Sequence, residues 1–222
     1  MNFGFVRVAA AVPKIKVADC GYNAARIIET AIKADEAGAQ FAVFPELSMT
    51  GYTCADLFNQ QALIDEARAR LGEIIERTKK TGLVILAGMP LLAGNRLFNC
   101  AFALQEGRIL GVVPKTYIPC CGEFYEKRWF AAGGEVAGGS ITLCGQTAPF
   151  GVDLMFGDEK DERICFAIEI CEDLWAAIPP SSCQALAGAS ILFNLSASDE
   201  TVGKHEYRRE PVSYTHLRAH ET

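Results

Sequence analysis

Residues 163–175, RICFAIEICEDLW, carry the clearest fold signal in the sequence. Side chains alternate between the two faces of a strand, so one face here holds only large apolar residues, namely Ile164, Phe166, Ile168 and Ile170. The other face holds Cys165, Ala167, Glu169 and Cys171. A strand this apolar is typical of a sheet that is covered on both sides. The stretch therefore predicts a buried strand with a thiol, Cys171, at its carboxyl end.

Further strands and helices are predicted on both sides of this strand. Apolar runs predict strands at 5–12, 39–45, 82–90, 97–105, 108–115, 140–145 and 189–197, with Glu106-Gly107 as a hairpin turn. Helical spacing predicts one helix opened by Asn23 and ended by Gly38, a second at roughly 61–80, and a third that contains Cys183, Leu186 and Ala187. This order indicates an α/β fold in three or four layers, with the helices outside the sheets.

The composition limits the size and the partners of the protein. Its 222 residues, 50% of them hydrophobic, suffice for one large domain or a domain and a half. The net charge is −6 and no run of basic residues occurs, which weighs against nucleic acid or an anionic membrane as a partner. No apolar run reaches the roughly 18 residues that a membrane-spanning helix needs.

The nine cysteines indicate the compartment. They form no C-x-x-C pair, and several lie inside apolar runs, as Cys100 and Cys165 do, where a free thiol acts as a small apolar residue. The N-terminal apolar stretch is interrupted by Arg7 and closed by Pro13, so it predicts a buried strand rather than a secretion signal. We therefore expect a reduced, cytoplasmic protein.

The C-terminal stretch 211–222, PVSYTHLRAHET, differs from the rest of the chain. It has no periodic apolar face and resembles a translated vector or adapter sequence, so we expect a disordered tail after a domain of residues 1–210. His216 and His220 have the i, i+4 spacing of a helical metal pair. No carboxylate or cysteine is arranged around them, so we predict no metal site there.

Three polar residues follow buried strands and form a coherent reactive set. Glu46 follows AQFAVFP, Lys115 follows RILGVVP, and Cys171 follows ICFAIEI. Strand ends are where layered α/β folds assemble their sites. A nearby ammonium lowers the pKa of a thiol and stabilises an oxyanion, while a carboxylate can take up the thiol proton and return it to a leaving amine. The set predicts nucleophilic catalysis by a cysteine.

Ordinary roles are the alternative for each of these residues. One cysteine among nine is usually structural, a glutamate after a proline usually belongs to a loop, and a lysine after a strand is usually solvated. Glu169, two residues before Cys171, also has two readings. It is either a functional group near a reactive thiol or a structurally paired carboxylate, and we favour the second.

The segments around the three residues resemble a known family. FPELSMTGY, PKTYIP with GEFYEKRWF, and ICEDLW occur in this order, and they resemble the Glu-Lys-Cys triad of the nitrilase (carbon–nitrogen hydrolase) superfamily. VRVAAAVPKIKVADCGYN and NLSASDETVGKHEYRR resemble its branch of glutamine-hydrolysing domains from glutamine-dependent NAD+ synthetases. The resemblance covers residues 5–210 and implies a four-layer αββα sandwich.

The resemblance implies a role for each matching residue. It makes Glu46 the general base, Lys115 the cation that stabilises the oxyanion, and Cys171 the nucleophile. The further matching positions are Glu123 as a second glutamate beside the triad, Glu172 as a contact of the substrate amino group and the N–H of the oxyanion hole, and Ser198 and Lys204 as contacts of the substrate's α-amino and carboxylate ends.

This chain departs from the family pattern at the substrate contacts. Lys204 stands where the resemblance also allows Arg, and a lysine binds a carboxylate less well than a bidentate arginine. Cys120 and Cys121 stand where relatives commonly have Asn and Tyr, and the loss of a tyrosine contact predicts weaker binding of glutamine.

The implied reaction is hydrolysis of L-glutamine to glutamate and ammonia through a thioester of Cys171. In the family the ammonia passes through a tunnel to a synthetase domain, which amidates deamido-NAD+ with ATP. The sequence has no Ser-Gly-Gly-x-Asp loop of that domain, so we expect no cofactor in this chain, and ATP and Mg²⁺ only in the absent synthetase domain. The resemblance also implies a homo-oligomer formed through this domain.

Two expectations concern completeness and function. Family members continue past YRR with strands that complete the second sheet, so we expect the C-terminal part of the sandwich to be incomplete, with an exposed sheet edge and a tendency to aggregate. Three functions remain open. They are the ammonia-supplying glutaminase part of an NAD+ synthetase, which we prefer, a stand-alone amidase for another small amide, and an inactive scaffold.

Overall fold

The computed structural model describes residues 5–120, 122–136, 139–159, 161–199, 201–204 and 206–207. Cys121 and the expected tail 211–222, with His216 and His220, lie outside these residues. The helices are α1 (Cys20–Glu36), α2 (Gln61–Thr78) and α3 (Pro180–Leu186), with short 3-10 helices η1 (Tyr52–Asn59), η2 (Glu126–Arg128), η3 (Gly133–Glu135) and η4 (Cys171–Trp175). The strands are β1 (Val8–Ala10), β2 (Phe41–Val43), β3 (Val84–Ala93), β4 (Arg96–Gln105), β5 (Arg108–Pro114), β6 (Ser140–Leu143), β7 (Gln146–Pro149), β8 (Met155–Gly157), β9 (Cys165–Ile170) and β10 (Ile191–Leu195).

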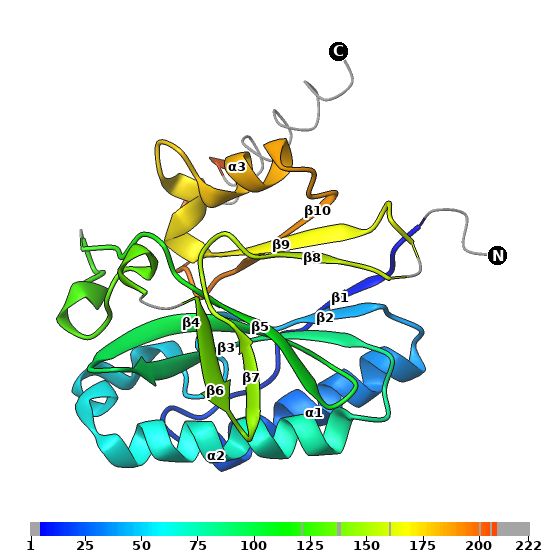
Figure 1. Ribbon diagram of the computed structural model, residues 1–222. Coiled ribbons are helices and arrows are strands. Elements are labelled where there is room, and N and C mark those ends of the chain that lie inside the picture. Colours follow the sequence, from blue (N-terminus) through cyan, green and yellow to red (C-terminus); the bar gives the residue numbers. More distant parts are fainter. Residues whose placement is uncertain are drawn as a thin grey trace.

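Two sheets face each other at the centre of the molecule (Figure 1). The larger sheet has the strand order β1-β2-β3-β4-β5 and the smaller one the order β10-β9-β8. β1, β2 and β3 are parallel, β3, β4 and β5 are antiparallel, and β9 runs parallel to β10. α1 and α2 cover the outer face of the larger sheet, and α3 lies outside the smaller one. The layers follow the expected αββα order.

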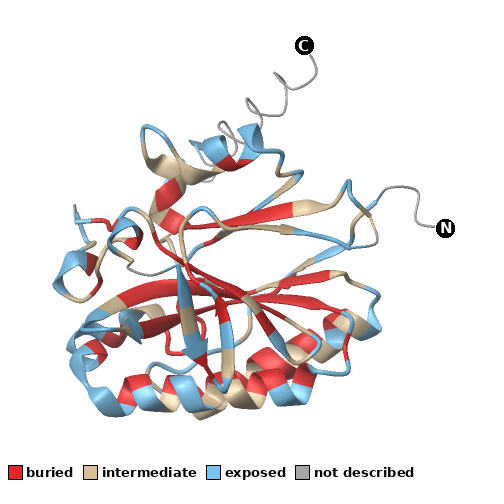
Figure 2. Ribbon diagram, in the orientation of Figure 1, coloured by how far each residue is buried: buried red, intermediate tan, exposed pale blue. Residues whose placement is uncertain are grey.

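Two apolar cores join these layers, and buried residues concentrate on the strands and on the inner faces of α1 and α2 (Figure 2). Strand alternation supplies both cores: Ile85 packs on the helix side, whereas Val84 and Leu86 pack between the sheets. Aromatic rings fill the space between the sheets, where the ring of Phe41 lies 5.1 Å from those of Phe166 and Phe193. This packing joins β2 of the larger sheet to β9 and β10 of the smaller one.

Several predicted elements are confirmed. α2 lies in the range expected for the second helix, and its apolar residues at helical spacing, such as Leu63, Ala67 and Leu71, are buried. β4 and β5 form the expected hairpin. Its turn residues Glu106 and Gly107 have φ of 48° and 79°, as the tight two-residue turns of hairpins require. β7 and β8 are strands that the sequence patterns did not predict.

The predicted start of the first helix is wrong. α1 begins three residues earlier than expected, and its N-cap is Asp19, whose side chain accepts the N–H of Tyr22 at 2.9 Å. Asn23 is buried inside the helix instead, and its amide donates to the carbonyl oxygens of Lys16 and Met49. It therefore ties the helix to the loop that follows β2.

α3 does not bury the residues whose spacing predicted it, since Cys183 and Leu186 are both exposed. Leu186 is 91% exposed, and the buried residue of this helix is Gln184, which donates to the Ile168 carbonyl of β9 at 3.2 Å. Within the described residues β10 pairs only with β9, and the expected exposed edge of the smaller sheet stays a prediction. None of the helices described is both long and apolar enough to cross a membrane.

Candidate active site

The three predicted residues Glu46, Lys115 and Cys171 come together where β2, β5 and β9 end. The Lys115 ammonium lies 2.7 Å from the Glu46 carboxylate, and both charges act on the Cys171 thiol. The segment after β10 completes the site. There the Ser196 hydroxyl lies 3.4 Å from the Cys171 sulfur, and the Ala197 N–H donates to Glu46 at 3.1 Å.

Glu46 is held in place by a close approach of two backbones. An added Cβ at Gly88 of β3 would lie 2.3 Å from the Leu47 nitrogen and 2.8 Å from the Pro45 oxygen, so only glycine fits there. The side chain of Asn99 on β4 donates to Glu46 Oε1 at 2.6 Å. The Glu46 side chain has no surface exposed to solvent, so its orientation is set by these protein contacts.

The second glutamate of the site is Glu126, and the prediction of Glu123 for this position is wrong. Both oxygens of Glu126 accept from Lys115 Nζ, at 2.8 and 3.0 Å, and the Tyr52 hydroxyl donates to it at 2.7 Å. Glu123 is exposed and lies beside Asp199 instead. The two glutamates are three residues apart in GEFYE. Glu123 precedes η2 and is exposed, whereas Glu126 is the first residue of η2 and is buried.

The charges of this buried cluster stabilise the ammonium. Burial alone would lower the pKa of Lys115, but the carboxylates of Glu46 and Glu126 outweigh burial, and the net pKa is raised. Burial raises the pKa of Glu126, and the charge of Lys115 opposes that shift. Lys115 therefore stays protonated at neutral pH.

Cys171 has a strained backbone that ends the alternation of β9. Its φ is 46°, a left-handed value that costs a non-glycine residue roughly 1–2 kcal/mol. The strand pattern predicted Cys171 on the face of Glu169, but the turn redirects the side chain into the core between the sheets, where it is 8% exposed. The Asn194 amide supports the turn by donating to the Cys171 carbonyl at 3.4 Å.

The thiol is protonated in the free site. Burial and the negative charge of Glu46 raise the pKa of Cys171 to about 12, although the charge of Lys115 lowers it. The expectation that Lys115 makes a ready thiolate is therefore incomplete, because burial and Glu46 outweigh it. A thiol next to a carboxylate can still react if the proton moves to that carboxylate during the attack.

Glu169 has the structural role that we favoured. Its oxygens accept from the Ser181 N–H and the Asn194 amide, each at 3.1 Å. The first bond fixes the start of α3, and the second orients the amide that contacts the Cys171 carbonyl. Glu169 thus supports the backbone turn at Cys171 indirectly, through the Asn194 amide.

A pocket of about 240 Å³ opens onto Cys171. It is lined by Pro119, Phe124, Cys171, Glu172, Trp175, Ser198, Lys204 and Tyr207, so three of the four predicted substrate contacts line it and Glu123 does not. The rings of Trp175 and Tyr207 stack at 5.1 Å and form one wall. The Lys204 ammonium is paired with Asp199.

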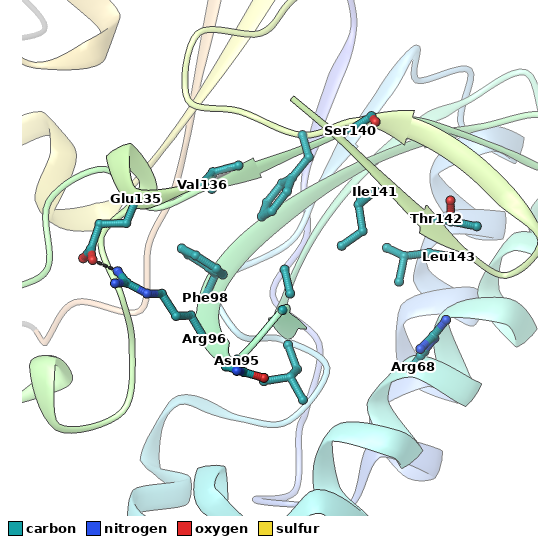
Figure 3. A pocket seen from close by; sticks show the side chains of 14 residues that line it. Arg68, Asn95, Arg96, Phe98, Glu135, Val136, Ser140, Ile141, Thr142 and Leu143 are labelled. Atoms are coloured by element: carbon teal, nitrogen blue, oxygen red, sulfur yellow. Dashed lines mark ion pairs between the residues drawn. The ribbon is translucent and has the colours of Figure 1, made fainter. Parts of the chain in front are cut away.

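A larger hollow of about 540 Å³ lies elsewhere, between the turn of the β3–β4 hairpin, β6 and α2 (Figure 3). Arg96 in it points to Glu135, with which it forms an ion pair, while Arg68 lies on the opposite side. None of the three reactive residues lines this hollow. The smaller pocket at Cys171 is therefore the candidate active site.

The sequence patterns missed three polar residues of the site: Asn99, Glu126 and Ser196. Asn99 was visible as a lone polar residue inside the apolar run LFNCAFAL, and Ser196 as a polar residue near the end of the predicted strand 189–197. Within the described residues no group of three or more His, Cys, Asp or Glu side chains could hold a metal ion.

Comparison with known sequences gives the class of protein. The carbon-nitrogen hydrolase family profile matches residues 7–221, and the chain therefore belongs to the carbon–nitrogen hydrolase family. The fold and the Glu-Lys-Cys cluster agree with this membership.

Individual relatives narrow the resemblance. The chain is 40% identical over 215 residues to the glutamine-dependent NAD(+) synthetase of Mycobacterium tuberculosis (strain ATCC 25618 / H37Rv), covering 94% of this chain and 32% of that protein. It is 30% identical over 209 residues to the enzyme of the same name from Thermotoga maritima, covering 94% of this chain and 33% of that protein. The chain thus spans about 32% of the length of such relatives.

Solved structures show the same likeness. The glutamine-dependent NAD(+) synthetase of Cytophaga hutchinsonii superposes with a TM-score of 0.81 at 26% identity, covering 93% of this chain and 33% of that one. An amidase from Nesterenkonia sp. superposes with a TM-score of 0.63 at 22% identity, covering 88% and 67% of the two chains, and shares the fold.

Proposed function

We propose that the chain hydrolyses L-glutamine to glutamate and ammonia, as the ammonia-supplying part of a glutamine-dependent NAD+ synthetase. The observation that carries this proposal is the buried contact of Lys115 with Glu46 next to the Cys171 thiol, which lines a pocket that also contains the cation of Lys204. The relatives named above support the choice of glutamine.

The geometry suits a thioester mechanism. The Cys171 sulfur attacks the amide carbon while its proton moves to Glu46, since the thiol is protonated beforehand. Lys115 and a backbone N–H stabilise the oxyanion. Glu46 then gives the proton to the departing nitrogen, the carbon–nitrogen bond breaks, and ammonia leaves. Water activated by Glu46 hydrolyses the thioester, which releases glutamate and restores the thiol.

The pocket rim supplies contacts for the amino-acid end of the substrate. Lys204 is the cation for the α-carboxylate, and Glu172 and Ser198 are contacts for the α-amino group. The ammonia is then available to a synthetase part that amidates deamido-NAD+, as the names of the relatives suggest. The cysteines that are buried and free, such as Cys54 and Cys100, favour the cytoplasm as the compartment.

One observation favours a second candidate, an amidase for another small amide. Lys204 is already neutralised by Asp199, which leaves less positive charge for an α-carboxylate. Such an enzyme would prefer amides without the amino-acid end.

The test is ammonia release from L-glutamine and from propionamide, with Cys171→Ala as the control. We expect release from glutamine at a kcat/KM at least tenfold above that for propionamide, and none from Cys171→Ala. A preference for propionamide would support the second candidate. No release from either amide by the folded protein would contradict both.

A further inference from the structure

Asp173 is a buried carboxylate that the proposed chemistry does not use. It lies two residues after Cys171 and is 1% exposed. Its oxygens accept three backbone N–H groups, from Tyr117 at 2.7 Å, Ile170 at 3.0 Å and Thr116 at 3.2 Å. A carboxylate only accepts hydrogen bonds, so it suits a place surrounded by donors.

The three donors come from the two halves of the site. Thr116 and Tyr117 directly follow Lys115, at the end of β5 in the larger sheet. Ile170 directly precedes Cys171, at the end of β9 in the smaller sheet. One carboxylate therefore connects the segment that carries the ammonium with the turn that carries the thiol.

The segments of Cys171 and Lys115 both need contacts that fix their positions. Cys171 has the left-handed φ of 46°, which its own backbone does not favour. Lys115 is fully buried and shared between Glu46 and Glu126, so a small shift of its segment would move it away from the sulfur. Misplacement of reacting groups by about 1 Å can cost a hundredfold in rate.

We propose that Asp173 is a positioning residue that keeps the Lys115 ammonium at the Cys171 thiol by joining the ends of β5 and β9. This role rests on the proposed thiol chemistry of Cys171, but it does not depend on glutamine as the substrate. Asn in its place would direct an amide N–H at a backbone N–H in either orientation, and so would break at least one of the three bonds.

The test measures alkylation of Cys171 by iodoacetamide at pH 8, with peptide mass spectrometry to read each cysteine separately. In Asp173→Asn, weaker contact with the ammonium lowers the thiolate fraction, and we expect the Cys171 rate to fall at least tenfold. The exposed Cys183 serves as the reference in the same sample and keeps its rate. Ile74→Val, in the buried face of α2 on the far side of the larger sheet, is the control for general destabilisation.

The outcomes separate positioning from a merely structural role. Simple loosening of the pocket would expose Cys171 and speed its alkylation. An unchanged or faster Cys171 rate in folded Asp173→Asn, or an equal slowing in Ile74→Val, would overturn the proposal.

If Asp173→Asn does not fold, hydrogen exchange in the unaltered protein is the second test. The Thr116 and Tyr117 amides, which lie outside any strand, should exchange at least a hundredfold more slowly than exposed loop amides, and fast exchange would overturn the proposal. If the protein proves not to hydrolyse glutamine, the alkylation rate of Cys171 and the exchange of the two amides still test the positioning role of Asp173.

Discussion

The Lys115 ammonium lies 2.7 Å from the Glu46 carboxylate, and neither side chain has any surface exposed to solvent. A second carboxylate, that of Glu126, contacts the same ammonium. Burying charges is costly unless they are paired and hydrogen-bonded, and here one cation serves two anions. Lys115 is therefore the central residue of the cluster, and removal of its ammonium should lower both the stability and the activity of the protein.

Lys115→Met should destabilise the fold strongly. It leaves Glu46 and Glu126 buried without a cation, and breaking a buried pair from one side typically costs about 3–5 kcal/mol. Urea unfolding measures the loss. Lys33→Met, which breaks an exposed pair with Glu29 on α1, is the control and should change stability far less. Equal losses in the two variants would contradict the buried cluster.

Gly88→Ala should displace the loop that carries Glu46. The added Cβ would meet the backbone of Leu47 at 2.3 Å, and overpacking of this kind costs about 1–3 kcal/mol or more. Gly82→Ala is the matched control, because nothing lies within 4 Å of a Cβ there. Thermal unfolding should show a large loss for Gly88→Ala and almost none for Gly82→Ala. Similar melting temperatures would show that the two backbones do not approach closely.

Alkylation of Cys171 in the absence of substrate should rise with pH without a plateau. The thiolate is the reactive form, and with a pKa of about 12 its fraction grows roughly tenfold per pH unit up to at least pH 10. An unperturbed thiol levels off above about pH 8.5. The Cys171 rate should therefore still be rising where such thiols have levelled off. A plateau below pH 8 would mean that the charge of Lys115, rather than burial, determines the pKa of the Cys171 thiol.

Lys204→Arg should improve glutamine binding if Lys204 contacts the α-carboxylate. A bidentate guanidinium adds a charge-assisted hydrogen bond, so KM should fall about fivefold, the equivalent of roughly 1 kcal/mol. The value of kcat should stay nearly constant, because the contact is the same in the ground state and the transition state. Steady-state kinetics with glutamine and propionamide measure both. An equal effect on propionamide, which has no carboxylate, would place Lys204 outside substrate binding.

Local patterns were sufficient for much of the fold. The period of α2 and the turn at Glu106-Gly107 are properties of neighbouring residues, and both are confirmed. The start of α1 was missed because Asp19 and Asn23 are both good capping residues, and only the tertiary contact of Asn23 with Met49 decides between them.

Each member of the reactive triad follows an apolar strand, and strand ends meet, so the pattern suggested the triad. The family resemblance was needed to choose it over ordinary roles. The second glutamate could not be predicted, since Glu123 and Glu126 lie on the same short segment and the choice depends on how η2 turns toward Lys115. The direction in which Cys171 points was also missed, because strand alternation fails at a residue with positive φ. An exposed edge of the smaller sheet, and aggregation through it, stay predictions.

The most direct test of the central claim is covalent labelling by a diazo-ketone analogue of glutamine, followed by peptide mapping. If Cys171, Lys115 and Glu46 form one reactive site, the folded protein takes up one label per chain, on Cys171 alone among the nine cysteines, and excess glutamine protects it. Cys171→Ala takes up none. Labelling that is spread over exposed cysteines such as Cys183, or absent from the folded protein, would contradict the account.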